Sequence, residues 1–356
     1  MKDLEKELSW VEDNFYLEPP HTVHFNITYR CKRRCLYCNN YAMVKQRYGS
    51  FRSANQVELG LNIIKRIMNE ANEVGVKLFN ISGGEPFLRN DVYEVIRHGV
   101  SLGMSIFPIT KYAFTTEEAE RLYDTGLRSI CVSFDSFEDH TNRKLHGSST
   151  IKRELLQSVD YLLRSGIEPV IAPVINTLNY KEYENLVQRF KKLGINLFAP
   201  MVIAETLLVT KQGLEPVKKS LQLSRRMRKN LREELTRIHG KYEVEEGGPF
   251  IPRKVEMACP AADHVHINPE GSLMYCASTP DLHFGSLKRK PLMEVWRSKR
   301  RRELMRPPRN KFRRAKCFDC EKYDFCNKLG RCYYEFMLRP PFYRPEEKRL
   351  CRKFLI

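Results

Sequence analysis

Three cysteines close together are the most chemically specific feature of the sequence. Cys31, Cys35 and Cys38 stand in the run RCKRRCLYC, with the spacing C-x₃-C-x₂-C. Three thiolates in one short loop can hold three irons of a [4Fe–4S] cube and leave the fourth iron open to another ligand. A zinc site fits less well, because structural zinc takes four ligands and no histidine stands in this loop. The loop therefore predicts an iron–sulfur site with one exchangeable position.

The motif Gly83-Gly84-Glu85-Pro86 follows directly after the apolar run KLFNIS at 77–82. Glycines at the end of a strand allow the backbone to approach a ligand closely. The Glu85 carboxylate can accept hydrogen bonds from a cationic amine. Taken alone, this motif predicts only a turn, and its place after a strand of the same repeat as the cysteine loop makes it a candidate binding site.

Eight further cysteines complete the total of eleven in the chain. Cys131 lies in the apolar run SICVSF, where we expect a buried structural thiol. The other seven are Cys259, Cys276, Cys317, Cys320, Cys326, Cys332 and Cys351, with Gly271 shortly before Cys276. In a reducing compartment such a set favours metal or cluster ligation over disulfides. A pair of zinc sites is the alternative to iron–sulfur clusters.

Six apolar runs with strand-like composition recur along the first 200 residues. They span 23–27, 77–82, 105–109, 129–134, 169–175 and 196–200. Helical patterns at 54–74, 91–102, 116–125, 151–165 and 181–193 separate them. Strands that alternate with helices predict βαβ units and a parallel sheet. We expect an α/β fold with a partial (β/α)₆ TIM-like barrel, and a doubly wound sheet is the alternative; in both, ligands bind at the C-terminal ends of the strands.

Changes in composition divide the chain into four predicted segments. They are an N-terminal helical extension at 1–20, the barrel core at 21–205, a helical connector at 206–254 and a cysteine-rich domain at 255–356. The connector contains a charge-rich stretch at 213–240 that predicts one long helix, followed by the breaker Gly247-Gly248-Pro249.

The chain is strongly basic: 61 Lys+Arg against 43 Asp+Glu give a formal net charge of +18. This charge favours an acidic partner, either a peptide or a nucleic acid. The basic run at 297–316 contains a single aromatic residue, Phe312, and so does not support a base-stacking surface. No apolar run reaches the roughly 18 residues of a membrane span, and the N-terminus has no apolar signal segment, so we expect a cytoplasmic protein.

The combination of CKRRCLYC with SGGEP resembles the radical S-adenosylmethionine (SAM) enzymes over about residues 20–200. The resemblance continues through VSFDSFEDHTNRKLHG at 132–147 and VINTLN at 174–179. It implies a [4Fe–4S] cluster on Cys31, Cys35 and Cys38, whose open iron binds the methionine moiety of SAM. The implied SAM contacts are Gly83, Gly84 and Glu85 at the amino group, Tyr37 beside the adenine, and Ser133 and Asp135 at the ribose or carboxylate. Reduction of the cluster would cleave SAM to a 5′-deoxyadenosyl radical that abstracts a substrate hydrogen.

The seven C-terminal cysteines resemble the SPASM extension, which in its full form carries two auxiliary [4Fe–4S] clusters, so three clusters are implied in total. The implied ligands of the distal auxiliary cluster are Cys317, Cys320, Cys326 and Cys351. Those of the cluster nearer the active site are Cys259, Cys276 and Cys332. A fourth ligand for this nearer cluster is not evident, and the alternatives are an open iron, Asp263, His264, His266 or a group of the substrate; ordinary loop residues are the favoured interpretation of these three side chains.

The sequence departs from relatives of this family at two places. ITKYAF at 109–114 stands where many relatives carry Thr-Asn-Gly, so no contact with SAM is predicted from this loop. Ala277 takes the place of an Asp that acts as general base in sulfatase-maturating relatives, which argues against that activity. His140 and His146 belong to the segment 132–147, and we expect solvated loop side chains, with a substrate-facing role as the alternative.

The resemblance implies an enzyme that modifies a ribosomally made peptide or protein by crosslinking, epimerisation or oxidation. A dehydrogenase or epimerase for a small molecule, such as an aminoglycoside or a sugar, is the alternative, and RNA modification is the third. A reductant such as flavodoxin or ferredoxin is an implied partner. Only 30 residues precede Cys31, fewer than the roughly 80–90 of a leader-binding domain. A separate leader-binding protein or the basic surface would then recognise the peptide.

Overall fold

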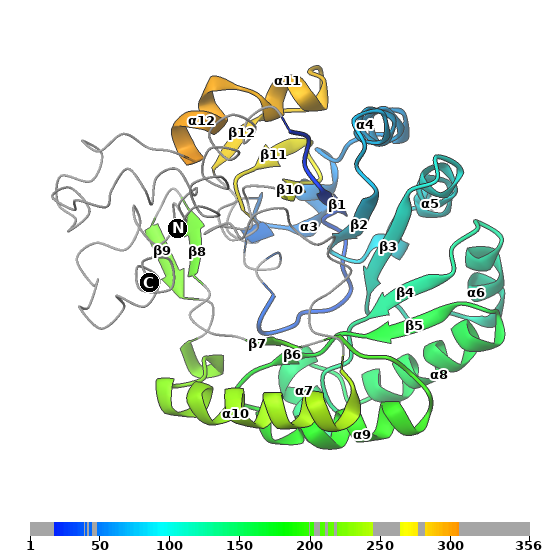
Figure 1. Cartoon of the computed structure of the whole chain (residues 1–356), viewed down its shortest axis with the longest axis vertical. Helices are drawn as coiled ribbons and strands as arrows, with labels where there is room; N and C mark the ends of the chain where they lie inside the picture. Colours follow the sequence, from blue (N-terminus) through cyan, green and yellow to red (C-terminus); the bar gives the residue numbers. More distant parts are fainter. Residues whose placement is uncertain are drawn as a thin grey trace, which may run out of the picture.

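A curved sheet with helices along its outer side forms the computed structural model of the chain (Figure 1). The structure describes residues 18–38, 40, 43–44, 48–198, 200–202, 207–210, 213–216, 219–244, 264–276 and 282–305. The main sheet has eight strands in the order β12-β11-β10-β1-β2-β3-β4-β5. Five consecutive strands, β1 to β5, are therefore neighbours in both sequence and space.

The strands of this central part run parallel to one another. Their bounds are β1 (Thr22–Thr28), β2 (Leu78–Gly83), β3 (Ser105–Thr110), β4 (Ser129–Val132) and β5 (Glu168–Ile171). Parallel neighbours need crossover connections, and a helix after each strand supplies them. All five C-terminal strand ends consequently lie on one side of the sheet, where the predicted site residues follow them.

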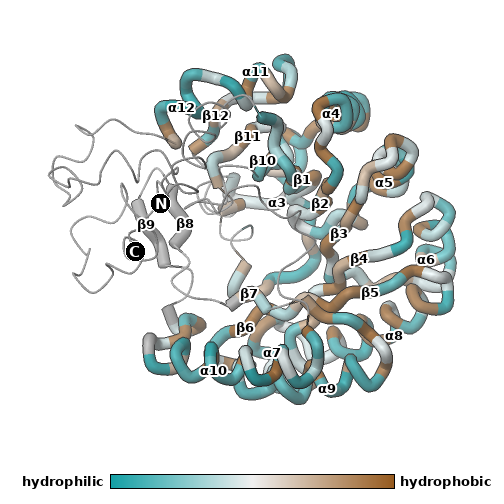
Figure 2. Tube along the Cα trace, in the orientation of Figure 1, coloured by the Kyte–Doolittle hydropathy of each residue, from teal (hydrophilic) through white to brown (hydrophobic). Residues whose placement is uncertain are grey.

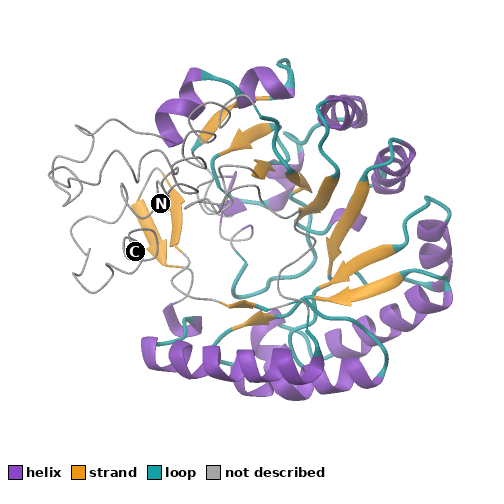
Figure 3. Cartoon of the chain, viewed as in Figure 1, coloured by secondary structure: helices purple, strands orange, loops and turns teal. Residues whose placement is uncertain are grey.

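Helices α4 (Leu61–Glu73), α5 (Val92–Ser101), α6 (Thr116–Tyr123), α8 (Ile151–Arg164) and α9 (Tyr183–Lys192) lie on the outer side of the strands (Figure 3). The same part of the chain also contains the short helices α3 (Phe51–Asn55) and α7 (Asp139–His146) and the 3₁₀ turns η1 (Pro86–Leu88) and η2 (Tyr180–Glu182). A capping box of Thr115 and Glu118 starts α6. Helices on one face only confirm the predicted barrel-like arrangement and exclude the doubly wound sheet.

Side-chain periodicity explains this arrangement. In β1, Val23, Phe25 and Ile27 alternate with polar residues, and all three are buried in the main core. On α4 the buried residues Ile64 and Ile67 fall on one helical face and join the same core. Figure 2 shows the result, with hydrophobic segments along the strands and hydrophilic ones on the outer side of the helices.

The inner face of the sheet carries a smaller apolar cluster, made of Leu78, Phe107, Cys131, Val170 and Phe198. Cys131 is 3% exposed, which confirms the predicted buried thiol, and burial raises its pKa to about 12. This apolar cluster fills part of the inside of the barrel, and polar residues lie at the C-terminal ends of the strands.

The fifth and sixth predicted strands are each interrupted in the structure. The run 169–175 is divided between β5 and β6 (Val174–Ile175), and β6 pairs in parallel with β7 (Met201–Val202). A single parallel bridge joins Ile171 to Leu197. A proline precedes each of the two short strands, Pro173 before β6 and Pro200 before β7. Proline removes a backbone hydrogen-bond donor, which explains why the strands are interrupted there.

The connector contains less helix than its charge pattern predicts. A hairpin of β8 (Leu207–Thr210) and β9 (Gly213–Pro216) comes first, then the turn η3 (Lys219–Leu221). Helix α10 (Arg225–Tyr242) begins only where the Ser224 hydroxyl accepts a hydrogen bond from the Met227 backbone N–H. The expected helix over 213–240 is therefore wrong in its first half. The predicted N-terminal helix lies almost entirely outside the described residues.

The C-terminal part adds to the barrel sheet. Its elements are β10 (His264–Ile267), β11 (Ser272–Met274), β12 (His283–Ser286), α11 (Leu292–Trp296) and α12 (Lys299–Met305). Strand β10 pairs in parallel with β1, with Thr22 opposite His264 and Phe25 opposite Ile267. Val265 and Ile267 are buried in the main core. Among the described residues, no helix is both long and apolar enough to cross a lipid bilayer.

Candidate active site

The cysteine loop begins where β1 ends, and two charged side chains fix its first residues. Glu58 Oε1 accepts hydrogen bonds from the Thr28 hydroxyl and the Tyr29 backbone N–H, both at 2.7 Å. The buried Arg89 guanidinium donates to the Ile27 carbonyl oxygen at 2.9 Å. The loop therefore leaves the C-terminal end of β1 along a defined path, at the edge where α/β barrels bind their ligands.

Gly83 and Gly84 allow β2 to approach this loop closely. The Gly84 N–H donates to the Thr28 carbonyl oxygen at 2.8 Å, and the Glu85 N–H donates to that of Arg30 at 2.6 Å. A Cβ on Gly84 would lie 2.1 Å from the Arg30 oxygen, and one on Gly83, where φ is +132°, would lie 2.4 Å from the Thr28 oxygen. The sequence predicted a close approach to a ligand, and the structure adds a close approach to the backbone of the cysteine loop.

The Glu85 carboxylate lies between the loops that follow β2 and β3. Its Oε1 accepts a hydrogen bond from the Thr110 hydroxyl at 2.6 Å, and its Oε2 accepts one from the Lys111 backbone N–H at 2.9 Å. Burial raises the pKa of Glu85 to about 7, although these hydrogen bonds oppose the rise. The loop at 109–114 thus contacts the site through Glu85. The departure of this loop from the family pattern gave no indication of that contact.

The three thiols of the loop are half-buried and fit an iron–sulfur cluster by their chemistry. Burial raises the pKa of Cys31 to about 11 and that of Cys35 to about 12, so both hold a proton until a metal displaces it. Within the described residues, no three His, Cys, Asp or Glu side chains converge as ligands of one metal ion do. Three cysteines that each bind a different iron of a cube need no such convergence.

Asp135 is the centre of a buried polar network beside the cysteine loop. Its Oδ1 accepts from the Val174 backbone N–H at 2.8 Å, and its Oδ2 accepts from Lys111 Nζ at 2.8 Å and from the Tyr37 hydroxyl. His146 Nε2 lies 3.0 Å from the same oxygen. Burial alone would raise the pKa of this carboxyl, but the Lys111 ammonium and the His146 hydrogen bond hold it well below its usual value.

His146 corrects one expectation from the sequence. It is the last residue of α7, its side chain is 1% exposed, and its Nδ1 lies 3.1 Å from Cys35 Sγ. The solvated loop position expected for it is therefore wrong, because α7 ends against the cysteine loop. His140 is exposed, as expected. The apolar–polar pattern of the short α7 gave no signal that its final residue faces inward.

Tyr37 and Ser133 complete the set of predicted SAM contacts. Burial and the neighbouring Asp135 charge raise the pKa of Tyr37 well above its usual value, and its ring packs edge-on against His146 at 5.9 Å. Ser133 is half-buried, and within the described part of the chain its hydroxyl makes no hydrogen bond. The structure thus gathers the predicted residues of β1, β2 and β4 at one end of the barrel, with Lys111 of the loop after β3 added to them.

Of the seven C-terminal cysteines, only Cys276 is described; it lies half-buried just after β11. Cys259, Cys317, Cys320, Cys326, Cys332 and Cys351 lie outside the described residues, as do Asp263 and Ala277. His264 and His266 stand in β10 rather than in a loop. The His266 ring stacks on that of His24 with centroids 4.8 Å apart, at the junction of β10 and β1.

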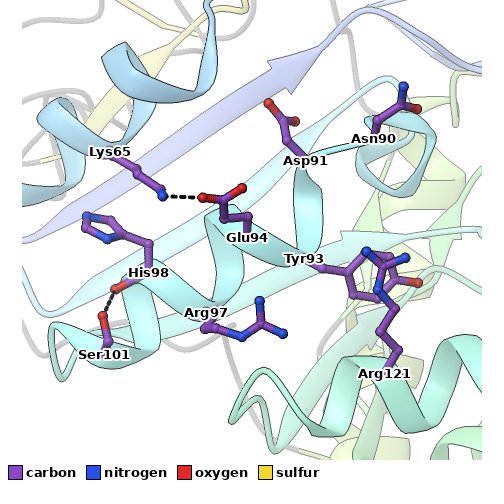
Figure 4. Close-up of a pocket in the computed structure, with 9 residues that line it drawn as sticks. All are labelled: Lys65, Asn90, Asp91, Tyr93, Glu94, Arg97, His98, Ser101 and Arg121. Carbon is purple, nitrogen blue, oxygen red and sulfur yellow. Dashed lines mark hydrogen bonds and ion pairs between the residues drawn. The ribbon is translucent and has the colours of Figure 1, made fainter.

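A cavity of about 600 Å³ lies elsewhere, on the outer helical side (Figure 4). It is lined by Lys65 of α4, Tyr93 and Arg97 of α5, and Arg121 of α6, whose guanidinium lies 4.1 Å from the centre of the Tyr93 ring. None of the predicted site residues lines it, so it is not the reaction site.

Relatives with known names share most of this chain. PqqA peptide cyclase of Granulibacter bethesdensis is 26% identical over 289 residues, which is 79% of this chain and 74% of that protein. GTP 3′,8-cyclase of Staphylococcus epidermidis is 28% identical over 185 residues, which is 50% of this chain and 53% of that protein. The first match is longer than the barrel core alone, whereas the second spans only half of the chain.

Solved structures share the fold. The crystal structure of Streptococcus suis SuiB bound to S-adenosylmethionine has a TM-score of 0.67 at 17% identity, and the match covers 93% of this chain and 77% of SuiB. SuiB has also been solved with its precursor peptide SuiA. The structure of anSMEcpe with bound AdoMet has a TM-score of 0.65 at 14% identity and covers 94% and 95% of the two chains.

Family models match both halves of the sequence. The iron–sulfur cluster-binding SPASM domain matches residues 259–321, which confirms the predicted extension. The Radical SAM superfamily matches residues 25–203, half of the chain, and includes the cysteine loop, Glu85 and Asp135. Members of this superfamily use SAM and a [4Fe–4S] cluster, and the SPASM domain indicates auxiliary clusters in addition. The chain therefore belongs to the Radical SAM superfamily, in its SPASM-containing subgroup.

Proposed function

We propose that this enzyme uses SAM, bound at the open end of the barrel, to modify a ribosomally made peptide. One observation carries the proposal most directly. The cysteine loop and the Gly83–Glu85 segment are joined by two backbone hydrogen bonds at the ends of neighbouring strands. A cluster on that loop and a methionine amino group on that segment would therefore be neighbours, as chelation of SAM by an open iron requires.

The proposed roles follow the geometry of the site. Cys31, Cys35 and Cys38 hold the SAM-binding cluster. When bound, this cluster supplies the electron that cleaves SAM to a 5′-deoxyadenosyl radical. The buried Glu85 carboxylate, with the backbone of Gly83 and Gly84, binds the cationic amino group of SAM, and that positive charge favours the ionised form of the carboxylate.

Ser133, Tyr37 and Asp135 receive different roles in this proposal. Ser133 has the open hydroxyl and binds the ribose or carboxylate of SAM. Tyr37 stands beside the adenine, with its hydroxyl held by Asp135. Three side chains of the protein, Tyr37, Lys111 and His146, already converge on Asp135 Oδ2, so we assign Asp135 the role of anchoring the site rather than binding SAM directly.

Two auxiliary [4Fe–4S] clusters are proposed for the C-terminal part. Cys317, Cys320, Cys326 and Cys351 hold the distal one, and Cys259, Cys276 and Cys332 hold the one nearer the active site. With the SAM-binding cluster, this assignment predicts about 12 irons per chain after anaerobic reconstitution. Zinc retained by the C-terminal cysteines in place of iron would refute it.

A peptide substrate is favoured by the relatives. PqqA peptide cyclase aligns with 79% of this chain, and the net charge of +18 suits an acidic peptide. Crosslinking is the preferred modification because the relative is named a cyclase; epimerisation and oxidation are the alternatives.

We further propose flavodoxin or ferredoxin as the reductant and a separate leader-binding protein as a partner.

A small-molecule reaction is the second candidate function, since half of the chain also resembles GTP 3′,8-cyclase. Reaction with candidate acidic peptides in heavy water, followed by mass spectrometry, separates the two. Crosslinking or oxidation removes two hydrogens from the peptide, and epimerisation adds one deuterium. An unchanged peptide together with turnover of free GTP or a sugar would overturn the peptide proposal, and the Cys31/Cys35/Cys38 triple Ala variant is the inactive control.

A further inference from the structure

A row of polar side chains crosses the inner face of the sheet. Leu78 belongs to the inner apolar cluster, so Asn80, two residues later on β2, lies on the same face. In the register of the sheet, His24 of β1 is opposite Asn80, and Phe107 of β3 is on its other side. His266 of β10 is opposite His24. The row therefore joins three polar residues to the apolar cluster.

Two members of this row hydrogen-bond to each other and leave further positions unused. Asn80 Nδ2 and His24 Nδ1 are 3.1 Å apart. Asn80 is 4% exposed, and its Oδ1 has no hydrogen-bond partner in the described part of the chain. Within the same described residues, neither His24 Nε2 nor either ring nitrogen of His266 takes part in a hydrogen bond. A buried amide oxygen without a partner costs free energy, and a bound polar group removes that cost.

The pair of Asn80 and His24 presents one hydrogen-bond donor and one acceptor. Burial lowers the pKa of His24 to about 4, so the ring is neutral at pH 7 and carries a single N–H. With Asn80 Nδ2 donating to His24 Nδ1, that N–H is on Nε2, and Asn80 Oδ1 is the free acceptor. The opposite rotamer of the Asn80 amide exchanges both roles and again leaves one donor and one acceptor. An amide group, which has one of each, is the complementary ligand.

The neighbours of this pair favour an uncharged group. The His266 ring stacks on that of His24 with centroids 4.8 Å apart, and burial lowers the pKa of His266 to about 3. Met274 of β11 extends the row beyond His266, and Phe107 is at its other side. None of these residues is charged at pH 7, so a bound carboxylate or ammonium group would lose its hydration without gaining a counter-charge.

The row is within reach of a substrate that lies against SAM. Asn80 precedes Gly83, the first residue of the segment assigned to the SAM amino group, by three residues on β2. This separation is about 10 Å along the strand. Three residues of an extended peptide span it, at roughly 3.5 Å per residue. A peptide that offers a hydrogen atom to the SAM end of the barrel can therefore contact this row as well.

We propose that Asn80 and His24 form a subsite that binds an uncharged amide group of the peptide substrate, either a backbone amide or an Asn or Gln side chain. This inference rests on the proposed function, because it names a group by which that peptide is held inside the barrel. His24 donates to the amide oxygen, and Asn80 accepts from the amide N–H. The pair determines specificity, since a carboxylate or a ketone in the same place forms only one of the two hydrogen bonds.

The first measurement compares four fragments of similar shape on the unaltered, reconstituted protein with its clusters oxidised. Saturation-transfer NMR gives the dissociation constants of benzamide, N-methylbenzamide, acetophenone and benzoate. Benzamide has the amide of a side chain and N-methylbenzamide that of a backbone, so the tighter of the two identifies the source of the amide. Acetophenone lacks the N–H donor, and benzoate carries a negative charge in place of it.

We expect acetophenone and benzoate each to bind about tenfold more weakly than the better amide, the effect of one lost hydrogen bond at a buried site. Equal binding of all four fragments, or binding of none, would mean that the unused positions hold only water. Either result would overturn the inference, and neither depends on a variant that folds.

Two variants test whether the fragment binds at this pair. Asn80→Leu keeps the size of the side chain and removes the acceptor, so the preference for the amide over acetophenone should disappear. His24→Phe keeps a ring beside His266 and removes the donor, so both fragments should bind about tenfold more weakly. The control is Asn185→Leu on the exposed side of α9, which should keep the wild-type constants. Unchanged amide binding in both variants would place the fragment elsewhere and contradict the subsite.

Failure of this inference can be distinguished from failure of the proposed function. The fragment comparison requires no cleavage of SAM, and the same preparation is assayed in parallel for 5′-deoxyadenosine. We expect both an amide preference and 5′-deoxyadenosine from the wild type. A wild type that forms 5′-deoxyadenosine but shows no amide preference contradicts the subsite alone. A wild type that prefers the amide but forms no 5′-deoxyadenosine contradicts the proposed function itself.

Discussion

At the scale of single residues, buried charge is what the site depends on most. Asp135 is fully buried, and Lys111, with its side chain 12% exposed, is its cationic partner. Removing one partner of a buried pair leaves the other charge uncompensated, which costs far more than the loss of a surface pair. Lys111 was overlooked in the sequence because one Lys among 61 basic residues carries no pattern.

We therefore expect Lys111→Met to destabilise the protein by about 3 kcal/mol. The matched control is Lys152→Met, which breaks a more exposed pair with Asp139, whose side chain is 55% exposed. That change should cost less than about 1 kcal/mol. Urea denaturation followed by circular dichroism measures both, and equal losses in the two variants would show that Asp135 is not held by Lys111.

At the scale of elements, the decisive contact is the approach of β2 to the end of β1. The sequence predicted β1 to β5 well, because alternating and continuous apolar runs specify parallel strands over short distances. It also placed the cysteine loop and the Gly83–Glu85 motif at strand ends. The inward position of His146 could not be predicted, since it depends on where α7 ends against a loop more than a hundred residues earlier.

The two glycines give a direct test of that approach. We expect Gly84→Ala to disrupt the cysteine loop, because the new Cβ would lie 2.1 Å from a carbonyl oxygen. Iron binding after reconstitution should fall at least severalfold, and the melting temperature should drop. The control is Gly240→Ala in α10, where a Cβ meets nothing within 4 Å; it should be neutral or stabilise by up to about 1 kcal/mol. Normal iron content in Gly84→Ala would contradict the close packing described here.

At the scale of the whole molecule, β10 continues the barrel sheet from the C-terminal part. The sequence indicated a cysteine-rich segment there but not this pairing, which joins residues more than 200 positions apart. The alternation in His264–Ile267 was open to interpretation as loop residues with metal-binding histidines. Instead, His266 stacks on His24 of β1, and both side chains are half-buried at the junction.

These histidines make the junction sensitive to acid. Burial lowers the pKa of His24 to about 4, and burial together with the His24 charge lowers that of His266 to about 3. In the unfolded chain histidine titrates near 6.5, so between these values the unfolded state binds more protons, and stability falls as the pH falls. Protonation of the unfolded chain at His266 removes about 2 kcal/mol of stability between pH 7 and pH 5.

Between pH 7 and pH 5, we expect His266→Gln to lose about 2 kcal/mol less stability than the wild type loses. Urea denaturation at pH 7 and pH 5 gives the difference directly. His140→Gln is the matched control, because His140 is exposed and its replacement should leave the wild-type pH dependence. A pH dependence of His266→Gln identical to the wild type would mean that His266 is accessible to protons in the folded state.

In the proposed function, the open end of this barrel binds a cluster and SAM and cleaves SAM reductively. The most direct test of this function is the formation of 5′-deoxyadenosine by the anaerobically reconstituted chain, with SAM and a strong reductant, quantified by liquid chromatography. We predict product with the wild type and none above background with the variant in which Cys31, Cys35 and Cys38 are all Ala. Equal 5′-deoxyadenosine from the two proteins would contradict the assignment of this site.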